Sequence, residues 1–175
     1  MGSNIYLSRR ARLLGLVGFF VLVFTGPGCA GTIQGQVLDA QTGQPIAGAV
    51  VLGVWMKVAG LPGLHHHELV GVEEVETDAE GRFILKRAKS IIHEDDESVT
   101  VYKFGYVAWN NIYMFPSSAR RKGQQVPPQI LLVRFPQGES HKRHHYFISD
   151  ATWGKDDPAK TPRFSQAVRR ELEAP

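Results

Sequence analysis

The run from Gly35 to Val51, GQVLDAQTGQPIAGAVV, constrains the fold of this chain more than any other stretch. It begins with alternating apolar and polar residues, breaks at Thr42-Gly43-Gln44-Pro45, and resumes as an apolar run. Alternation with a period of two is typical of a half-buried strand, and a Gly- and Pro-containing segment between two such runs is typical of a turn. The run therefore predicts a strand, a tight connection and a second strand.

Further along the chain, apolar segments of strand length are separated by turn residues. The second segment is apolar on both faces, which is typical of a central strand that is covered above and below. Short strands with turn signals between them favour an all-β sandwich of two sheets. The polar, basic stretch 116–128 is expected to be a loop. We expect seven strands, at residues 32–39, 47–58, 69–77, 83–85, 99–104, 107–114 and 130–135.

A leader segment precedes these strands. Residues 1–28 contain three arginines, then twelve uncharged residues from Leu13 to Phe24, and then small residues up to Cys29. This order is typical of a secretory signal peptide. A helix of twelve residues would span roughly 18 Å, which is short of the roughly 30 Å of a bilayer's hydrocarbon core. We therefore favour a cleaved signal peptide over the alternative, a retained membrane anchor.

Cys29 is the one cysteine of the chain, and it directly follows Gly28 at the end of the leader. This position is similar to the lipobox of bacterial lipoproteins, in which the cysteine is lipidated and becomes the new N-terminus. Gly26 and Pro27 depart from the usual lipobox residues, so the alternative is cleavage by an ordinary signal peptidase, with Cys29 as an incidental thiol. No aspartate follows Cys29, which resembles lipoproteins sent to the outer membrane. Acyl chains would hold the domain at that membrane.

The leader also decides how the charge of the chain is interpreted. The full chain has 20 basic and 17 acidic side chains, but Arg9, Arg10 and Arg12 lie in the leader, which has no acidic residue. The mature chain is therefore neutral when its histidines are uncharged, and the basic isoelectric point of the precursor is no sign of nucleic-acid binding. With Cys29 lipidated, no thiol remains for a disulfide, so a packed core must stabilise the mature domain.

Three short motifs follow one another along the expected strands: Gly-x-Val-x-Asp with a Thr-Gly-x-Pro turn, Thr-Asp-x-x-Gly-x-Phe, and a Gly-Tyr pair. Together they resemble the carboxypeptidase regulatory-like domain, a transthyretin-like or Ig-like β-sandwich, which we place at residues 29–135. The resemblance implies that these residues serve turns and core. The residues that carry it are Gly35, Val37, Asp39, Thr42, Gly43, Pro45, Ile46, Gly48, Ala49, Val51, Thr77, Asp78, Gly81, Phe83, Gly105 and Tyr106.

The resemblance does not imply peptidase activity. In metallocarboxypeptidases this domain lies beside a separate catalytic domain, and no sequence remains here to supply one. The chain also lacks a His-Glu-x-x-His zinc motif, a Gly-x-Ser-x-Gly nucleophile elbow and a phosphate-binding loop. We therefore expect a protein that is not an enzyme.

Two groups of histidines lie outside the turn and core positions. Imidazole clusters suit zinc or copper, and two loops at one end of a sandwich could bring them together. However, adjacent residues of a strand point in opposite directions, so neighbouring histidines cannot all face one metal. Exposed histidines are the simpler interpretation, and metal binding is the alternative. The candidate ligands are His65, His66 and His67 in an expected loop, and His141, His144 and His145 after the last strand.

Aromatic residues gather in the expected strand 107–114. Trp109 and Tyr113 are four residues apart, so on one strand they would share a face and could form a stacking platform for a glycan or peptide. The alternative is that both fill the core, which is the commoner place for large aromatic side chains.

The C-terminal extension, residues 136–175, differs from the rest of the chain. Thr161-Pro162 is typical of a helix start, and Phe164, Val168 and Leu172 recur at every fourth position after it. The sequence therefore predicts a short amphipathic helix. We expect its apolar stripe to dock on the sandwich, with a partner-binding helix as the alternative.

These inferences describe a non-catalytic lipoprotein of the cell envelope with a binding or assembly role. Its expected partners are the outer membrane, through the lipid anchor, and an envelope protein, peptide or glycan, but no nucleic acid. The competing hypothesis is a metal-binding or metal-dependent periplasmic protein that uses the two histidine groups.

Overall fold

The structure is a computed structural model, and it describes residues 31–61, 63–87, 96–122 and 125–174. The leader 1–28 and Cys29 lie outside the described residues. Within them the chain forms nine strands followed by two helices. These elements are β1 (Thr32–Asp39), β2 (Val50–Ala59), β3 (His66–Glu76), β4 (Arg82–Lys86), β5 (Asp96–Tyr102), β6 (Trp109–Asn110), β7 (Tyr113–Met114), β8 (Ala119–Arg120), β9 (Gln129–Leu132), α1 (His141–Ala151) and α2 (Pro162–Glu173).

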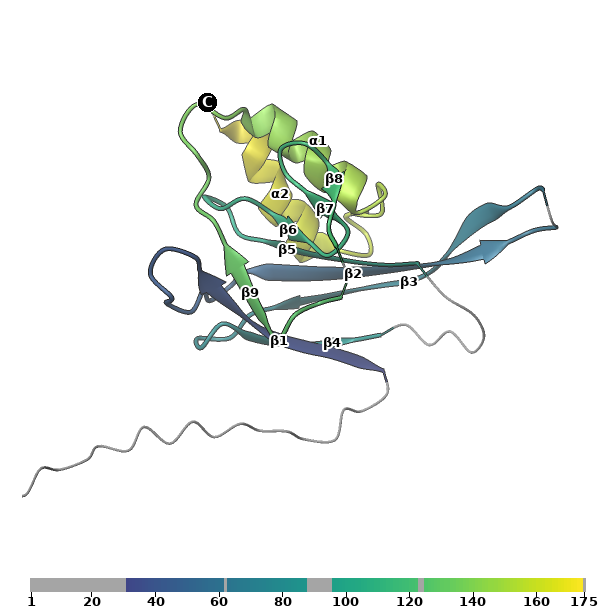
Figure 1. The fold of residues 1–175 in the computed structure, drawn as a ribbon, viewed down its shortest axis with the longest axis horizontal. Coiled ribbons are helices and arrows are strands. Elements are labelled where there is room, and N and C mark those ends of the chain that lie inside the picture. Colours follow the sequence, from purple (N-terminus) through teal and green to yellow (C-terminus); the bar gives the residue numbers. More distant parts are fainter. Residues whose placement is uncertain (1–30, 62, 88–95, 123–124, 175) are drawn as a thin grey trace, which may run out of the picture.

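The strands form two larger sheets and one small one. One sheet has the order β4-β1-β9 and the other β3-β2-β5-β6, while β7 and β8 pair with each other. β1 is antiparallel to β4 and parallel to β9. Both helices lie on one side of the four-stranded sheet, opposite the β4-β1-β9 sheet (Figure 1). The molecule is mostly β, as expected, but it has three layers because a pair of helices covers the second sheet.

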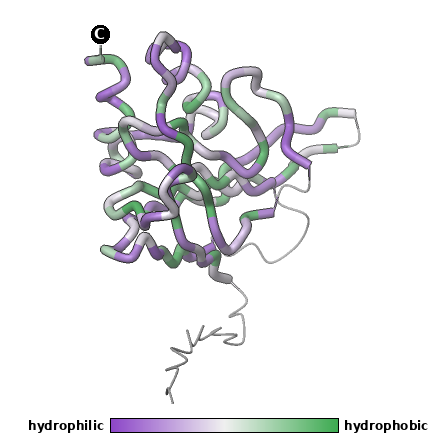
Figure 2. Tube along the Cα trace, turned by 60° about the vertical axis from the view of Figure 1, so that its left-hand side comes forward, coloured by the Kyte–Doolittle hydropathy of each residue, from purple (hydrophilic) through white to green (hydrophobic). Residues whose placement is uncertain are grey.

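A first core fills the space between the two larger sheets. β1 contributes Ile33 and Val37, which are buried on one face, whereas Gln34 on the other face is exposed. Gly35 lies between them, and a Cβ at this position would be only 3.0 Å from the ring of Phe83, which would have to shift. Figure 2 shows that hydrophobic and hydrophilic residues are interspersed along the chain.

A second core lies between the four-stranded sheet and the helices. Alternate residues of β2 point to opposite faces, so Val51 and Trp55 join the first core while Leu52 and Val54 join the second. All four are nearly or fully buried. The prediction that this strand is central and covered on both faces is therefore confirmed. Each fully buried aliphatic side chain contributes roughly 1.5–3 kcal/mol to the stability of the fold.

Both helices turn an apolar side to this second core. Ser140 caps α1, because its Oγ accepts a hydrogen bond from the backbone N–H of Arg143 at 3.3 Å. α2 begins at Pro162, a position where the missing N–H costs nothing. Neither of these two helices of the described residues is long and apolar enough to span a bilayer.

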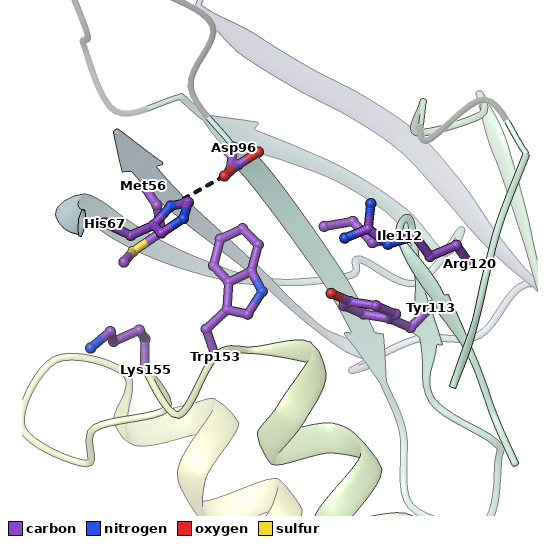
Figure 3. Close-up of a pocket in the computed structure, with 8 residues that line it drawn as sticks. All are labelled: Met56, His67, Asp96, Ile112, Tyr113, Arg120, Trp153 and Lys155. Atoms are coloured by element: carbon purple, nitrogen blue, oxygen red, sulfur yellow. Dashed lines mark ion pairs between the residues drawn. The ribbon is translucent and has the colours of Figure 1, made fainter. Parts of the chain in front are cut away.

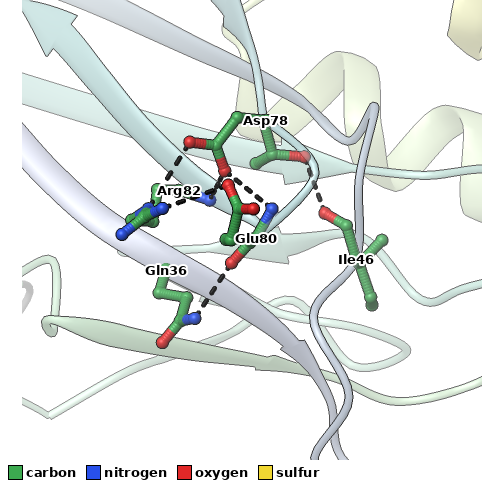
Figure 4. Close-up of polar contacts among 6 residues, drawn as sticks. Gln36, Ile46, Asp78, Glu80 and Arg82 are labelled. Carbon is green, nitrogen blue, oxygen red and sulfur yellow. Dashed lines mark hydrogen bonds and ion pairs between the residues drawn. The ribbon is translucent and has the colours of Figure 1, made fainter.

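The motif Thr77-Asp78 builds the turn between β3 and β4 (Figure 4). Asp78 Oδ1 accepts hydrogen bonds from the backbone N–H groups of Glu80 at 3.0 Å and Arg82 at 2.7 Å. Thr77 Oγ1 donates to the carbonyl of Ile46 at 2.7 Å. These side chains satisfy backbone groups, so they serve the scaffold.

The expectation of seven strands was wrong, since the described residues contain nine. The segment 107–114 is not one strand because Asn110 Oδ1 accepts hydrogen bonds from the N–H groups of Ile112 and Tyr113, both at 2.8 Å. This turn ends β6 and starts β7. The expected loop 116–128 contains β8, which pairs with β7.

The expectation of a single short C-terminal helix was also wrong. The tail that carries His141, His144 and His145 forms α1. Its buried residues are His144, Phe147, Ile148 and Ala151, which recur with the spacing of one helix face. In α2, the expected stripe holds for Phe164 and Val168, but Leu172 is 58% exposed and Glu171 takes the buried position instead.

Candidate functional site

A pocket of about 440 Å³ lies where the start of β5 and the β2–β3 and β7–β8 hairpins meet the connection between α1 and α2 (Figure 3). Four separate parts of the chain therefore build its wall, and no single motif marks it in the sequence. The residues that line it are Met56, His67, Asp96, Ile112, Tyr113, Arg120, Trp153 and Lys155.

The lining combines buried apolar groups with two aromatic rings. Met56 and Ile112 are each 7% exposed. Tyr113 and Trp153 are half-buried, and both pack against the second core. Figure 3 shows the indole of Trp153 rising from the α1–α2 connection toward the strands. Rings held in this way offer a flat, preorganised surface for stacking.

Asn110 fixes the position of Tyr113. It is fully buried, and its Nδ2 donates hydrogen bonds to Ser98 Oγ and Thr100 Oγ1, both at 2.9 Å. Its Oδ1 accepts the N–H of Tyr113, and its carbonyl accepts Arg121 Nε at 2.6 Å. The side chain and backbone of Asn110 are therefore both anchored, and the β7 strand starts from a rigid point.

The C-terminal end of α1 fixes the position of Trp153. Ser98 Oγ donates to the carbonyl of Ala151 at 2.6 Å, which ties the helix end to β5. The next residues are Trp153, with φ 53°, and Gly154, with φ 62°. A left-handed conformation costs a residue other than glycine roughly 1–3 kcal/mol, and such strain is often found at binding sites. Hydrogen bonds from Trp153 N–H to Asp150 and from Gly154 N–H to Ser149 hold this geometry.

The charges of the pocket are mostly positive. Asp96 is paired with His67, whose Nδ1 lies 3.3 Å from Asp96 Oδ2. Arg120 lies over the ring of Tyr113, with its Cζ 5.9 Å from the ring centroid. In the described part of the chain, neither Arg120 nor Lys155 is in an ion pair with a carboxylate. The pocket can therefore receive an anionic group beside a ring or an apolar surface.

A second group of functional side chains is buried where α1, α2 and β5 meet. Glu171 is 1% exposed, and its Oε1 accepts hydrogen bonds from Tyr102 Oη at 2.7 Å and from His144 Nδ1 at 3.0 Å. Its Oε2 pairs with His141 Nδ1. The ring of His141 stacks on Phe135, with centroids 4.4 Å apart. The carboxylate thus has three donors around it.

The tautomer of His144 follows from its partners. Its Nε2 accepts a hydrogen bond from the backbone N–H of Ala108 at 2.8 Å, so this nitrogen carries no proton. Nδ1 must then carry the proton and donate it to Glu171. Because both nitrogens are used, His144 has no free nitrogen for proton transfer to a substrate.

The pKa values reflect this arrangement. Burial acts to raise the pKa of Glu171, but the hydrogen bonds from His144, Tyr102 and His141 outweigh it and hold the pKa below its usual value. Burial, followed by the hydrogen bond to Glu171, raises the pKa of Tyr102. The cluster therefore contains a charged carboxylate and a neutral phenol at neutral pH.

The histidines proposed as metal ligands lie in different places. His65 is exposed before β3, His66 Nε2 pairs with Glu68 Oε1 at 3.0 Å, and His67 lines the pocket. His141 and His144 share Glu171, and His145 is half-buried on α1 beside Tyr146. Within the described ranges, no group of three or more His, Cys, Asp or Glu side chains is placed to hold a metal. Zinc or copper binding by these histidines stays a prediction.

Trp109 and Tyr113 are not brought together on one exposed face. Trp109 is 8% exposed in the first core, with the guanidinium of Arg121 5.2 Å from its ring centroid. Tyr113 packs against the second core and lines the pocket. The two separate because the chain turns at Asn110 between them. Tyr113 is the only one of the two that lines the pocket.

Sequence reasoning missed Arg120, Trp153 and Lys155, which join Tyr113 in the pocket. No local pattern marks them, since β9 and α1 lie between Arg120 and the pair Trp153 and Lys155 in the sequence. His144 and Glu171 had a usable signal, because each falls on the buried face of its helix when the helix period is drawn through the neighbouring apolar residues.

No protein-family model and no curated protein matches this chain. Among solved structures, the chain is similar to the crystal structure of a 9R-lipoxygenase from Cyanothece PCC8801, with 23% identity and a TM-score of 0.28 over 41% of this chain and 10% of that one. It is also similar to the Streptococcal ancillary pilin, with 15% identity and a TM-score of 0.28 over 61% of this chain and 30% of that one. Both TM-scores are too low to carry an argument about fold or function.

Proposed function

We propose that this chain is a non-catalytic, lipid-anchored protein of the cell envelope whose pocket binds an acidic glycan. The single observation that carries the proposal is the pairing of two aromatic rings, Tyr113 and Trp153, with two cations, Arg120 and Lys155, that have no carboxylate partner among the described residues. Sugar rings stack on aromatic faces, and a sugar carboxylate would pair with the cations.

The pocket has the composition of a small-molecule site. It combines apolar floor residues, two aromatic walls and a few charged groups that would fix the orientation of a ligand. Its rings are already held in place by the Asn110 turn and by the end of α1. A preorganised pocket loses little entropy on binding, which favours affinity.

The proposed scaffold is a carboxypeptidase regulatory-like, transthyretin-like sandwich attached to the outer membrane through Cys29. The contacts of Thr77, Asp78 and Ile46 support the scaffold, because motif residues satisfy turn backbone there. The lipobox-like position of Cys29 supports the anchor. The chain would then present its pocket to ligands in the periplasm or at the cell surface.

The absence of catalysis is part of the proposal. The most deeply buried cluster of catalytic residue types among the described residues is Tyr102, His144 and Glu171, and its hydrogen-bonding groups are already used by one another and by the backbone of Ala108. A general base needs a free nitrogen or oxygen within reach of a substrate proton. The cluster therefore fits a role in fixing α1 and α2 on the sheet.

Isothermal titration calorimetry of the mature chain with a hexasaccharide of glucuronic acid would test the proposal. We expect saturable binding to the wild type and at least a tenfold loss of affinity, about 1.4 kcal/mol, in the double variant Arg120→Gln/Lys155→Gln. The variant Lys160→Gln is the matched control, since Lys160 lies exposed in the same α1–α2 connection but outside the pocket.

A neutral hexasaccharide of glucose separates stacking from charge recognition. We expect it to bind more weakly than the acidic one and to be insensitive to the double variant. Equal affinity of the wild type and the double variant for the glucuronic acid hexasaccharide would contradict the proposal. So would an acidic peptide that competes for the pocket with higher affinity than the sugar.

A further inference from the structure

The β2–β3 hairpin projects beyond the body of the molecule. β2 pairs with β5 only as far as Met56, opposite Asp96, whereas its pairing with β3 continues from Lys57 to Ala59. Among the described residues, the two strands beyond Met56 therefore pair only with each other. Figures 1 and 2 both show the hairpin extending away from the layers. An isolated two-stranded hairpin is only marginally stable in water, so an apolar tip on it needs an explanation.

The described tip is apolar and exposed. Leu64 is 75% exposed and Leu61 is 71% exposed, which makes them the two most exposed large hydrophobic side chains of the described chain. Val58 beside them is 51% exposed. Single exposed apolar residues are common on protein surfaces, but a group of them on a protruding loop marks an interaction site.

The stem below the tip is polar, and its charges are paired. Lys57 Nζ lies 2.9 Å from Glu68 Oε2, and His66 Nε2 lies 3.0 Å from Glu68 Oε1. An apolar tip above a polar stem matches the change from acyl chains to headgroups at a bilayer surface. A second copy of this chain is a weaker candidate, because a stable dimer buries about 1,200–2,000 Å² and three side chains cannot supply that area.

The first described residues lie at the end of the molecule from which the β2–β3 hairpin projects (Figure 1). The carbonyl of Gly31 accepts the N–H of Arg87 at 2.6 Å, and Arg87 Nε lies 2.7 Å from Glu97 Oε2. The same carboxylate oxygen accepts Trp55 Nε1 at 2.9 Å. Trp55 directly precedes the point where the hairpin leaves the sheet, so a series of three contacts links the start of β1 to this point.

The segment between Cys29 and β1 can be compared in length with the projecting part of the hairpin. Cys29 is three residues before Thr32, and three extended residues span at most about 11 Å. Ala59 is three residues beyond Met56, and three residues of a strand rise about 10 Å. The segment between Cys29 and β1 is therefore about as long as the paired part of the hairpin beyond Met56.

We propose that the hairpin tip, Val58, Leu61 and Leu64, inserts into the lipid bilayer as a second attachment point beside the acylated Cys29. The proposal rests on the proposed lipidation of Cys29 for its geometry. Two attachment points fix the orientation of the domain, whereas one flexible tether would leave it free to rotate. The inserted tip would hold the sandwich with one end toward the membrane.

The precursor with Leu61→Cys, expressed with its leader in a Gram-negative host, provides the test. The purified chain is labelled with the environment-sensitive dye NBD and reconstituted with vesicles of phosphatidylethanolamine and phosphatidylglycerol. We expect NBD emission at position 61 to shift to the blue and to rise at least threefold. The control is Ile84→Cys, an exposed apolar position on β4 within the body of the molecule. It should keep the emission of a dye in water.

Mass spectrometry of Cys29 measures the acyl chains separately. A chain without lipid contradicts the proposed anchor, and insertion is then measured with Cys29→Ser on the same vesicles. In that unlipidated chain, Leu61→Asp/Leu64→Asp should lower the vesicle-bound fraction at least fivefold, whereas Ile84→Asp/Leu131→Asp should leave it unchanged. Equal emission at positions 61 and 84 overturns insertion, and so does a dimer in solution that Leu61→Asp/Leu64→Asp converts to a monomer.

Discussion

Glu171 connects the two helices to the sheet through its hydrogen bonds. It lies on α2, and its partners Tyr102 and His144 lie on β5 and α1. A buried carboxylate is tolerated only when its hydrogen bonds are complete, and removing one partner leaves the others unsatisfied. One side chain therefore ties three elements together.

The variant Glu171→Gln should lower the free energy of unfolding by about 3 kcal/mol, because the amide cannot accept from all the donors that now face it. Urea unfolding followed by far-UV circular dichroism measures this loss. Glu173→Gln, on the exposed side of the same helix, should stay within about 0.5 kcal/mol of the wild type. Similar losses for both variants would show that the cluster adds no stability.

Asp39, the last residue of β1, stabilises the β4-β1-β9 sheet on the side of the molecule opposite the helices. Burial acts to raise its pKa, but hydrogen bonds from the N–H groups of Gln41 and Thr42 and from Tyr106, together with the charge of Arg134, lower the pKa to about 2 from 3.8. Since the folded pKa lies below the unfolded one, the stabilising effect is complete above pH 3.8 and is lost as the pH falls toward 2.

Asp39→Asn should therefore have a lower melting temperature than the wild type at neutral pH, and this difference should shrink below pH 3.8 and vanish near pH 2. Thermal unfolding at a series of pH values measures it. Tyr106→Phe removes one of the donors and should give a smaller loss with the same pH course. A difference that stays constant down to pH 2 would contradict this role.

At the level of single residues, the sequence predicted the residues of the turns and the core better than the residues of the pocket. Asp39, Asp78 and Phe83 could be assigned to turns and core because turn chemistry and alternation are local. The pocket could not be predicted, because Arg120 and Trp153 meet only after α1 has packed on β5. Of the residues proposed for ligand stacking, Tyr113 lines the pocket and Trp109 does not.

Among the elements, α2 shows how a predicted stripe is corrected by packing. Phe164 is fully buried and Val168 is 2% exposed, but the stripe then rotates, so Leu172 faces solvent and Glu171 faces the sheet. A step of four residues falls 40° beyond a full helical turn, and after two steps Leu172 has moved off the buried face. The sequence predicted the helix and its docking on the sheet, but not that Glu171 rather than Leu172 would be the buried residue near its C-terminal end.

Phe164→Ala should therefore lower the free energy of unfolding by roughly 3–5 kcal/mol, because it leaves a cavity between α2 and β2. Leu172→Ala should change it by less than about 0.5 kcal/mol. Denaturant unfolding of both variants checks the pair. Equal losses would mean that the helix packs with its full stripe inward, as the sequence alone suggests.

The strands β1 to β5 were predictable because each is long enough to show its period. α1 was not, since its buried face contains a histidine and only three apolar residues, and since basic residues surround them. β6, β7 and β8 have two residues each, so none of them is long enough for an alternating pattern to repeat.

The whole molecule is a sandwich with a helical third layer, and its function is proposed to lie at the edge between layers. The first core needs only the two sheets, whereas the second exists because α1 and α2 cover β2 and β5. The pocket opens where this second core ends, and the hairpin projects from the same end of β2. Ligand binding and membrane contact would thus occur at neighbouring places on one domain.

The three tryptophans give the most direct test of the central claim, that the pocket is a ligand site. Trp55 and Trp109 are buried in the first core, and only Trp153 lines the pocket. In a two-dimensional ¹H–¹⁵N NMR spectrum of the mature chain, each indole gives its own N–H resonance. Titration with the glucuronic acid hexasaccharide should shift the Trp153 resonance and leave those of Trp55 and Trp109 in place. An unshifted Trp153 resonance at saturating sugar, or an equal shift of all three, would contradict the claim.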